Sequence, residues 1–275
     1  MEFNDWKYYN HAMIPTTAPH EIPDISSIKD GSIWKENKHA LFARWTTDFD
    51  CDYETDWWYI VRWSPFDFDC LDSSSRKHIR QALKKCKVNI INPKEEIEHI
   101  YRVYEEAYTR YKKFDNKHDY NVFKKQVENN VKDGVEYWGA YNNENRLIGW
   151  ISVKNYNTYI QTITAKFSTD YLKLGASAAL YYHILTYYLN GYGIKYVCSG
   201  EKSINHTTNT QEYKIKTFGY KKVYCKLNIA YNPKIKWIIK MLYPFRKLLK
   251  CFDCIMFLHR VNAVLSMEEI VRKQK

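Results

Sequence analysis

The chain has 275 residues, of which 45% are hydrophobic and 27% are charged, and its formal net charge is +11. These values exclude a globally disordered chain and predict one large domain or two small ones with a sizeable core. The excess of Lys and Arg favours anionic partners, such as a nucleic acid, a nucleotide-bearing cofactor or an acidic membrane surface, although a solvated basic surface accounts for the charge equally well.

Three prolines, Pro15, Pro19 and Pro23, predict that residues 1–39 are irregular. Hydrophobic periodicity then predicts a regular series of elements. In chain order these are strands at 40–49 and 57–63, a helix at 73–86, a strand at 88–91, helices at 94–111 and 119–134, strands at 135–141, 147–154 and 158–167, a helix at 170–190, a strand at 194–198, a helix from about 211 and a strand at 222–231. This order predicts an α/β fold with a central mixed sheet flanked by helices.

Four segments of this series carry a resemblance to a known fold. They are LDSSSRKHIRQALKKC at 71–86, YWGAYNNENRLIGWISV at 137–153, TDYLKLGASAALYYHIL at 169–185 and TQEYKIKTFGY at 210–220. In this order they resemble the GNAT acyltransferases, and the later segments are similar to the FemAB-like branch, the peptidoglycan-bridge aminoacyl transferases. The resemblance covers roughly residues 40–231. It implies an acyl- or aminoacyltransferase.

The resemblance departs from the usual GNAT pattern before the long helix. GNAT enzymes normally carry a Q/R-x-x-G-x-G/A loop there, whose N–H groups hold the pyrophosphate of coenzyme A. This chain has YLKLGAS, with Gly175 alone. We still predict a cofactor-binding anion site at the helix start, formed by Lys173 and Gly175, for acyl-CoA or aminoacyl-tRNA as the co-substrate. FemAB-like enzymes take their aminoacyl group from charged tRNA, which suits the basic charge.

Acyl transfer requires a group that accepts the proton of the nucleophile, and N–H donors that stabilise the oxyanion. Glu201 and His206 lie in the polar stretch after the strand at 194–198, where loops of an open α/β sheet bind ligands. They are the predicted catalytic residues, and Glu201 is the first choice for general base. In the competing interpretation, Glu201 pairs with Lys202 at the surface and His206 is solvated.

The substrate-binding candidates are polar, cationic or aromatic side chains. They are Trp58, Arg76, Arg80, Ser199, Asn209, Gln211 and Lys216. Arg76 and Arg80 lie one turn apart on a helix that we expect to be capped by Ser73 or Ser74. The two arginines can hold a phosphate or carboxylate together, or form a solvated face. Asn209 can alternatively cap the next helix.

The segment at 234–250 contains no acidic residue. Its apolar and cationic side chains are predicted on opposite helical faces, with Ile238, Leu242, Phe245 and Leu249 on one and Lys236, Lys240, Lys247 and Lys250 on the other. Such a helix can lie on an anionic membrane surface with its lysines toward the headgroups. Alternatively, it packs on the domain with its lysines in water. Pro244 is expected to kink it.

Seven irregularly spaced cysteines predict reduced thiols in a cytoplasmic protein, and we expect no metal at the lone C-x-x-C of Cys251 and Cys254. Neither a signal peptide nor a spanning helix is expected, so the predicted location is cytoplasmic or peripheral at the inner face of the membrane.

We therefore predict an N-terminal extension at 1–39, a GNAT-like domain at 40–231 and C-terminal helices at 232–275. The predicted activity is acyl or aminoacyl transfer from acyl-CoA, an acyl carrier protein or aminoacyl-tRNA to an amine or hydroxyl of a cell-envelope-type acceptor. The alternative is a non-catalytic GNAT-like module that binds nucleic acid or an anionic membrane surface.

Overall fold

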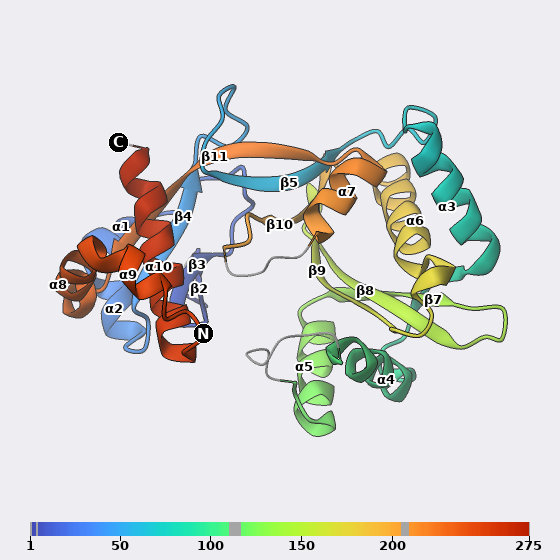
Figure 1. Ribbon diagram of the computed structural model, residues 1–275, viewed down its shortest axis with the longest axis horizontal. Coiled ribbons are helices and arrows are strands. Elements are labelled where there is room, and N and C mark those ends of the chain that lie inside the picture. The colour runs from blue at the N-terminus through green and yellow to red at the C-terminus, as the bar shows by residue number, and fades with distance from the viewer. Residues whose placement is uncertain (1, 4, 110–116, 205–208, 275) are drawn as a thin grey trace. The chain divides into compact units, whose positions relative to one another are not determined.

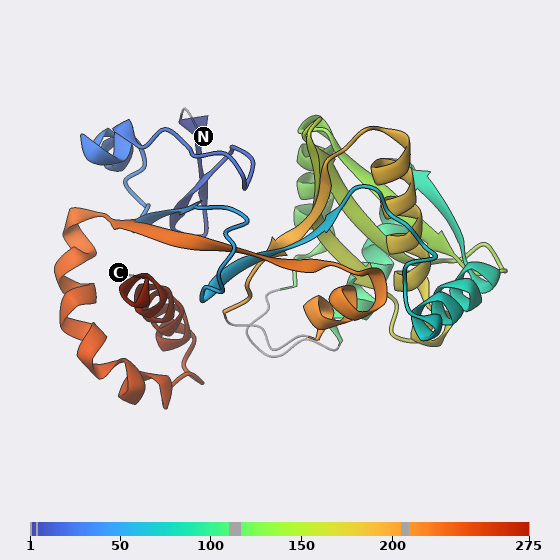
Figure 2. The same cartoon turned by 90° about the horizontal axis from the view of Figure 1, so that it is seen from above.

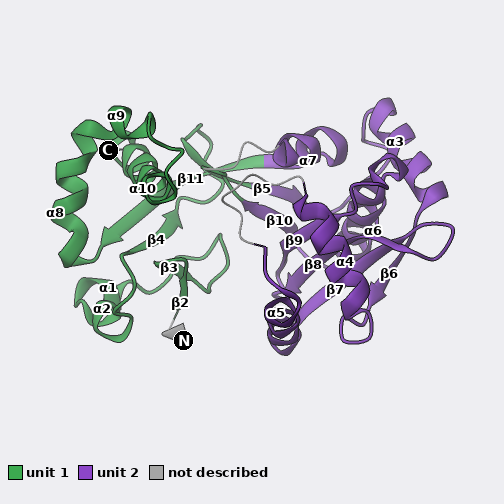
Figure 3. Ribbon diagram, turned by 60° about the horizontal axis from the view of Figure 1, so that its bottom comes forward, with its two compact units in different colours: residues 1–59, 201–207, 222–275 green, residues 60–200, 208–221 purple. Residues whose placement is uncertain are grey.

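The computed structural model describes residues 2–3, 5–109, 117–204 and 209–274. It divides the chain into two compact units (Figure 3). Unit 1 comprises residues 1–59, 201–207 and 222–275, and unit 2 comprises residues 60–200 and 208–221. Each unit is therefore built from several stretches of the chain, and the division differs from the predicted bounds at residues 39 and 231.

Unit 2 contains a mixed sheet with helices on both faces (Figure 1). Its strands, in spatial order, are the last four residues of β5 (Trp57–Trp63), then β10 (Tyr196–Glu201), β9 (Tyr159–Phe167), β8 (Leu147–Asn155), β7 (Val135–Tyr141) and β6 (Lys87–Ile91). Its helices are α3 (Ser73–Lys85), α4 (Ile97–Tyr108), α5 (Tyr120–Lys132), the short η1 (Leu172–Leu174), α6 (Ala176–Gly191) and α7 (Thr210–Phe218). β10 runs parallel to β9, whereas β6 to β9 are antiparallel. The predicted α/β fold class is confirmed.

The core of unit 2 follows from the predicted apolar stripes. α4 and α5 cover one face of the sheet, where Ile100, Val103 and Phe123 pack with Trp150. α6 lies on the other face with α3 beside it (Figure 1). α6 is buried along most of its length because its residues are apolar almost all round.

The cap of α3 differs from the prediction. Asp72 occupies the N-cap position and accepts a hydrogen bond from the backbone N–H of Ser75 at 2.9 Å. Its carboxylate also accepts from the hydroxyls of Ser74 and Ser75. These hydrogen bonds lower the pKa of Asp72 well below its usual range. A carboxylate is the stronger acceptor, so the serines act as its donors.

Unit 1 holds a smaller sheet in the order β1-β2-β3-β4-β11. Its strands are β1 (Glu2–Phe3), β2 (Trp6–Tyr9), β3 (Ala12–Pro15), β4 (Phe42–Thr47) and β11 (Lys221–Tyr231). Its helices are α1 (Ser26–Lys29), α2 (Ser32–Glu36), α8 (Pro233–Leu242), the short η2 (Tyr243–Phe245), α9 (Arg246–Lys250) and α10 (Met256–Lys273). In Figure 2, α8 and α9 form an arc around α10.

The N-terminal segment is more regular than its prolines predict. Trp6, Met13 and Ile33 are fully buried and form a small core with Ala40 and Ala43. Burial of these side chains compensates for the poor intrinsic propensity of the segment. Among the described residues, no helix combines the length and the apolarity that crossing a bilayer requires.

Candidate functional site

Two parallel strands of unit 2 separate where the candidate site begins. β10 pairs with β9 from Tyr196–Tyr159 to Cys198–Gln161, and both strands continue beyond this last recorded pair. β9 also carries a bulge at Ile163, where its register against β8 shifts. Backbone N–H groups along such an unpaired strand edge can donate to a ligand or to a developing oxyanion.

A buried lysine lies beside the diverging strands. Lys214 of α7 is only 5% exposed, and its ammonium donates a hydrogen bond to the hydroxyl of Ser199 on β10. The same ammonium stands 4.9 Å from the ring centroid of Tyr181 on α6. A buried cation needs such partners, because desolvation of an unpaired charge is very costly. Ser199 was predicted as a substrate-binding residue, whereas Lys214 was not.

The signal for Lys214 was present in the sequence. Lys214, Thr217 and Phe218 are the buried residues of α7, and a spacing of three and four residues places them on one helical face. An apolar residue such as Phe218 marks the buried face of the helix, and Lys214, one turn earlier, belongs to the same face.

Two tyrosine hydroxyls enlarge the buried polar cluster. Tyr181 and Tyr220 are each 1% exposed, and their hydroxyls have no hydrogen-bond partner within the described residues. Burial, followed by the nearby Tyr181 and Cys198, raises the pKa of Tyr220 well above its usual value. Buried polar atoms of this kind ordinarily bind water or a ligand.

The start of α6 supplies a second group of polar atoms. The hydroxyls of Ser177 and Tyr213 are 3.3 Å apart, and the Tyr213 hydroxyl is 3.4 Å from Nε2 of His78 on α3. Burial raises the pKa of Tyr213, so this hydroxyl stays protonated at neutral pH and can act as a proton donor. Tyr213 and His78 were not predicted as site residues.

Gly175 ends η1 and serves as the N-cap of α6 in the left-handed conformation, with φ of 82°. A Cβ atom there would lie 2.9 Å from the Cβ of Ala82 on α3. Close helix packing therefore accounts for this glycine. The first N–H groups of α6 lack intrahelical acceptors, as at any helix start, and Lys173 is exposed on η1. These groups fit a phosphate chemically, and the predicted anion site stays a prediction.

Arg76 and Arg80 both contact the loop before α3. Nη1 of Arg76 donates to the carbonyl oxygen of Asp69 at 3.1 Å and lies 3.7 Å from its carboxylate. The guanidinium of Arg80 stands 5.2 Å from the ring centroid of Phe68. These contacts favour the interpretation in which each arginine stabilises the loop, and shared anion binding stays a prediction.

The remaining candidates of unit 2 lie on α7. Asn209 occupies the N-cap position, but its side chain makes no capping hydrogen bond. The side chain of Gln211 is half-buried and that of Lys216 is exposed. The backbone oxygen of Lys216 accepts a hydrogen bond from the hydroxyl of Ser75, which ties α7 to α3.

Glu201 and Trp58 belong to unit 1. Glu201 is the last residue of β10, and its carboxylate forms an ion pair with Arg44 of β4. The ammonium of Lys202 instead donates to the carbonyl oxygen of Asp56 at 2.7 Å, so the alternative partner considered for Glu201 is wrong. Trp58 is half-buried under the ammonium of Lys222, 5.0 Å from the ring centroid. His206 lies outside the described residues.

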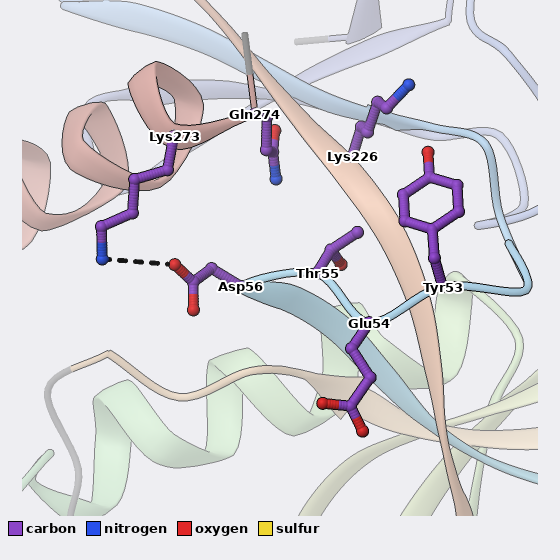
Figure 4. Close-up of a pocket in the computed structure, with 7 residues that line it drawn as sticks. All are labelled: Tyr53, Glu54, Thr55, Asp56, Lys226, Lys273 and Gln274. Carbon is purple, nitrogen blue, oxygen red and sulfur yellow. Dashed lines mark hydrogen bonds and ion pairs between the residues drawn. The ribbon is translucent and has the colours of Figure 1, made fainter.

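Two hollows elsewhere in the described residues contain none of the predicted catalytic, substrate-binding or cofactor-binding residues. One of about 500 Å³ in unit 1 is shown in Figure 4 and contains the ion pair of Lys273 and Asp56 at 3.4 Å, with the Glu54 carboxylate turned away from both. Another, of about 170 Å³, lies between α4, α5 and the sheet of unit 2 and is ringed by aromatic side chains. Within the described ranges, no group of three His, Cys, Asp or Glu side chains can hold a metal ion.

Comparison with known proteins agrees with this architecture. No protein-family model matches the sequence, and no curated protein does. Solved structures match along most of the chain. FemX has a TM-score of 0.59 at 9% identity, over 85% of this chain and 85% of its own. L-PGS from Bacillus licheniformis has a TM-score of 0.53 at 12% identity, over 86% of this chain and 82% of its own. A conserved protein of unknown function from Bacteroides thetaiotaomicron has a TM-score of 0.50 at 12% identity, over 81% and 83%.

The fold is GNAT-like, of the FemAB type. At these identities the likeness establishes the fold alone, and at that level the resemblance carried by the four segments is confirmed. In the GNAT-like unit, the diverging ends of β9 and β10, the start of α6 and the buried face of α7 contribute the polar atoms described above. This cluster is the candidate active site.

Proposed function

We propose that the protein transfers an acyl or aminoacyl group from an activated donor to an amine or hydroxyl of a cell-envelope-type acceptor. The observation that carries the proposal is the separation of β9 from β10 beside the buried Lys214–Ser199 pair and the Tyr213 hydroxyl. Support also comes from the fold shared with FemX and L-PGS. Both features suit a reaction whose carbonyl needs fixed N–H donors and a proton source.

The proposed step is a nucleophilic substitution at the acyl carbon. The acceptor nitrogen or oxygen forms a bond to that carbon and loses one proton, while the C–S bond of a thioester or the C–O bond of an aminoacyl ester breaks. Exposed N–H groups of β9 stabilise the oxyanion of the tetrahedral intermediate. The leaving sulfur or oxygen takes a proton, for which the Tyr213 hydroxyl is our candidate donor because burial keeps it protonated.

Glu201 remains our proposed general base. It follows Ser199 by two residues at the end of β10, and the intervening Gly200 has a φ of +95° that turns the backbone there. Its carboxylate is engaged by Arg44. A role in proton transfer therefore requires that Arg44 leaves one carboxylate oxygen accessible to the nucleophile.

The proposed donor carries a nucleotide, either as acyl-CoA or as aminoacyl-tRNA. Lys173 and the first N–H groups of α6 would hold a phosphate of either donor. The single glycine before α6 supports a donor that does not depend on a glycine-rich pyrophosphate loop, and the net charge of +11 suits tRNA.

A two-donor assay tests the proposal. The full chain is incubated with a radiolabelled aminoacyl-tRNA pool or with acyl-CoA, together with lipid and peptidoglycan precursors. We expect label transfer with one donor class, or release of free thiol with the other, and loss of most turnover in Tyr213→Phe. The proposal is wrong if neither donor supports transfer. If salt-sensitive RNA binding is also retained in Tyr213→Phe and Glu201→Gln, the protein is instead the non-catalytic binding module.

A further inference from the structure

The segment from α8 to the start of α10 exposes a series of large apolar side chains to water, which we call the stripe. The stripe consists of six large side chains, each at least 48% exposed: Trp237, Met241, Phe245, Leu248, Phe252 and Phe257. Trp237 and Met241 lie one turn apart on α8, Phe245 ends η2, Leu248 lies on α9 and Phe252 follows in the turn after α9. Among proteins that act alone in water, an uncovered stripe of this kind is uncommon and marks an interaction site.

Packing inside unit 1 does not require this face. α8 is anchored through Ile239, which is 7% exposed, while Leu242 and Leu249 are half-buried. The apolar face predicted from the sequence is therefore divided: Leu242 and Leu249 lie toward the unit, and Ile238 and Phe245 lie in water. The exposed side chains belong to α8, η2, α9 and the residues up to the start of α10, and Figure 2 shows the arc that α8 and α9 form around α10.

The charge beside the stripe is strongly positive. Between Lys234 and Arg260 there are seven Lys and Arg residues and one carboxylate, that of Asp253. Arg246 pairs with Glu269 at 3.3 Å and is neutralised. The five lysines of α8 and α9 are exposed, and within the described residues no carboxylate lies within 4.0 Å of their ammonium groups. Their charge is therefore available to an anionic partner.

We propose that this stripe docks the protein on an anionic lipid bilayer. Apolar side chains would enter the acyl boundary while the lysines meet anionic headgroups. Trp237, with the Lys240 ammonium 5.3 Å from its ring centroid, is a residue pair suited to the headgroup level. The proposal goes beyond the transfer reaction and does not depend on it.

The charge and the apolar area together favour lipid over other partners. A second copy of this chain would bring two sets of unpaired lysines face to face, which is unfavourable. A nucleic acid would neutralise the lysines but would leave Met241 and Leu248 in water, because phosphates offer them no apolar contact. A bilayer with anionic headgroups accommodates both kinds of side chain.

Vesicle flotation with the full chain tests the proposal. Vesicles of phosphatidylcholine with about one-third phosphatidylglycerol are compared with vesicles of pure phosphatidylcholine. We expect binding to the anionic vesicles to be at least about tenfold tighter, since each lysine near the surface contributes roughly fivefold. Raising the salt to about 1 M should weaken it, because the Debye length falls to about 3 Å.

Two triple variants separate the contribution of the apolar side chains to vesicle binding from that of the lysine charges. Met241→Ser/Phe245→Ser/Leu248→Ser should reduce binding about tenfold or more. Its matched control is Ile22→Ser/Leu41→Ser/Val122→Ser, which removes exposed apolar side chains elsewhere and should bind normally.

The charge variant is Lys236→Gln/Lys240→Gln/Lys247→Gln, and its control removes three exposed lysines of α5, Lys124→Gln/Lys125→Gln/Lys132→Gln. The charge variant should lose most of its preference for anionic vesicles, whereas the control should keep it. Circular dichroism and melting temperature verify that each variant is folded.

Three results would overturn the proposal. The first is no flotation of the native chain with anionic vesicles at low salt. The second is equal binding by the apolar variant and its control. The third is a chain that does not bind vesicles but forms a dimer in sedimentation, or binds RNA, in a way that the apolar variant abolishes. That result would assign the surface to self-association or to nucleic acid.

Discussion

The side chains that define the candidate active site are polar groups held in an apolar environment. Lys214 and Ser199 illustrate this, because the ammonium is nearly inaccessible and the Ser199 hydroxyl is its hydrogen-bond acceptor. A buried donor that loses its acceptor keeps the full desolvation penalty, whereas replacing both partners with apolar groups can be almost neutral. Substitutions of the pair should therefore be strongly non-additive.

We predict that Ser199→Ala lowers the free energy of unfolding by about 1–3 kcal/mol. The double variant Ser199→Ala/Lys214→Met should recover most of this loss, because no buried charge remains without a partner. A double-mutant cycle measures this by urea denaturation. It compares the free energy of unfolding of the native chain, the two single variants and the double variant. Equal destabilisation in Ser199→Ala and in the double variant would show that the hydrogen bond does not support Lys214.

The Glu201–Arg44 pair makes a prediction about activity. Glu201→Gln should reduce kcat by about 10²-fold or more, the range expected for removal of a general base. Arg44→Lys retains a cation opposite the carboxylate and should keep most of the activity. Steady-state rates with the productive donor measure both. A Glu201→Gln enzyme that turns over at the native rate would leave Glu201 with a structural role alone.

At the scale of elements, the site depends on how two helices begin. α6 starts at a left-handed glycine pressed against α3, and α3 starts at a carboxylate that receives three hydrogen bonds. Both arrangements fix helix positions that the site needs, because α3 provides His78 and α6 provides Ser177. Each start can be perturbed by one substitution.

Gly175→Ala should destabilise the protein by more than Gly134→Ala does. Both glycines have φ near +80°, but the Cβ site at Gly134 has no atom within 4 Å, whereas that at Gly175 meets Ala82. The control should lose about 1 kcal/mol from the backbone alone, and Gly175→Ala should lose more because α3 must move. Urea denaturation measures the difference in the free energy of unfolding. Equal losses in the two variants would mean that α3 moves away from the added Cβ at no energetic cost.

The α3 cap should make stability sensitive to acid. The pKa of Asp72 is lowered in the folded chain by its hydrogen bonds to Ser74 and Ser75. Its stabilising contribution is therefore complete above the unfolded-state pKa, near 3.9, and is lost as pH falls through the lower folded-state value. Asp72→Asn keeps a capping residue but cannot titrate. Its melting temperature should fall less steeply below about pH 4 than that of the native chain, and parallel curves would exclude this contribution.

For the whole molecule, the dominant property is its positive charge. If aminoacyl-tRNA is the donor, its apparent KM should rise about tenfold or more between 50 and 200 mM salt, which corresponds to about two phosphate contacts. Uncharged competing substrates should show no such change. Initial rates over a salt series measure the slope, and a KM for tRNA that is independent of salt would argue against backbone recognition of RNA.

Sequence alone predicted the helices and strands whose apolar patterns are regular, such as the stripe of α4 and the all-round apolar α6. Sequence patterns failed to predict contacts between residues that are far apart in the chain, because such contacts depend on tertiary packing. The partner of Glu201 is Arg44, which lies 157 residues away, and no local pattern identifies it. The prolines of the first 39 residues predicted irregular structure, although Pro15 ends a short strand that burial of Met13 stabilises.

Unit 1 is assembled from early and late parts of the chain, and this has a consequence for protein synthesis. Phe42 and Trp57, made early, are covered by Met267 and Ile270 of the last helix. More than 200 residues separate these partners, so a ribosome must add all of them after Trp57 before the two apolar surfaces can meet. Until then the nascent N-terminal strands carry exposed aromatic side chains. We expect chaperone dependence and aggregation of prematurely terminated chains to concentrate in this unit.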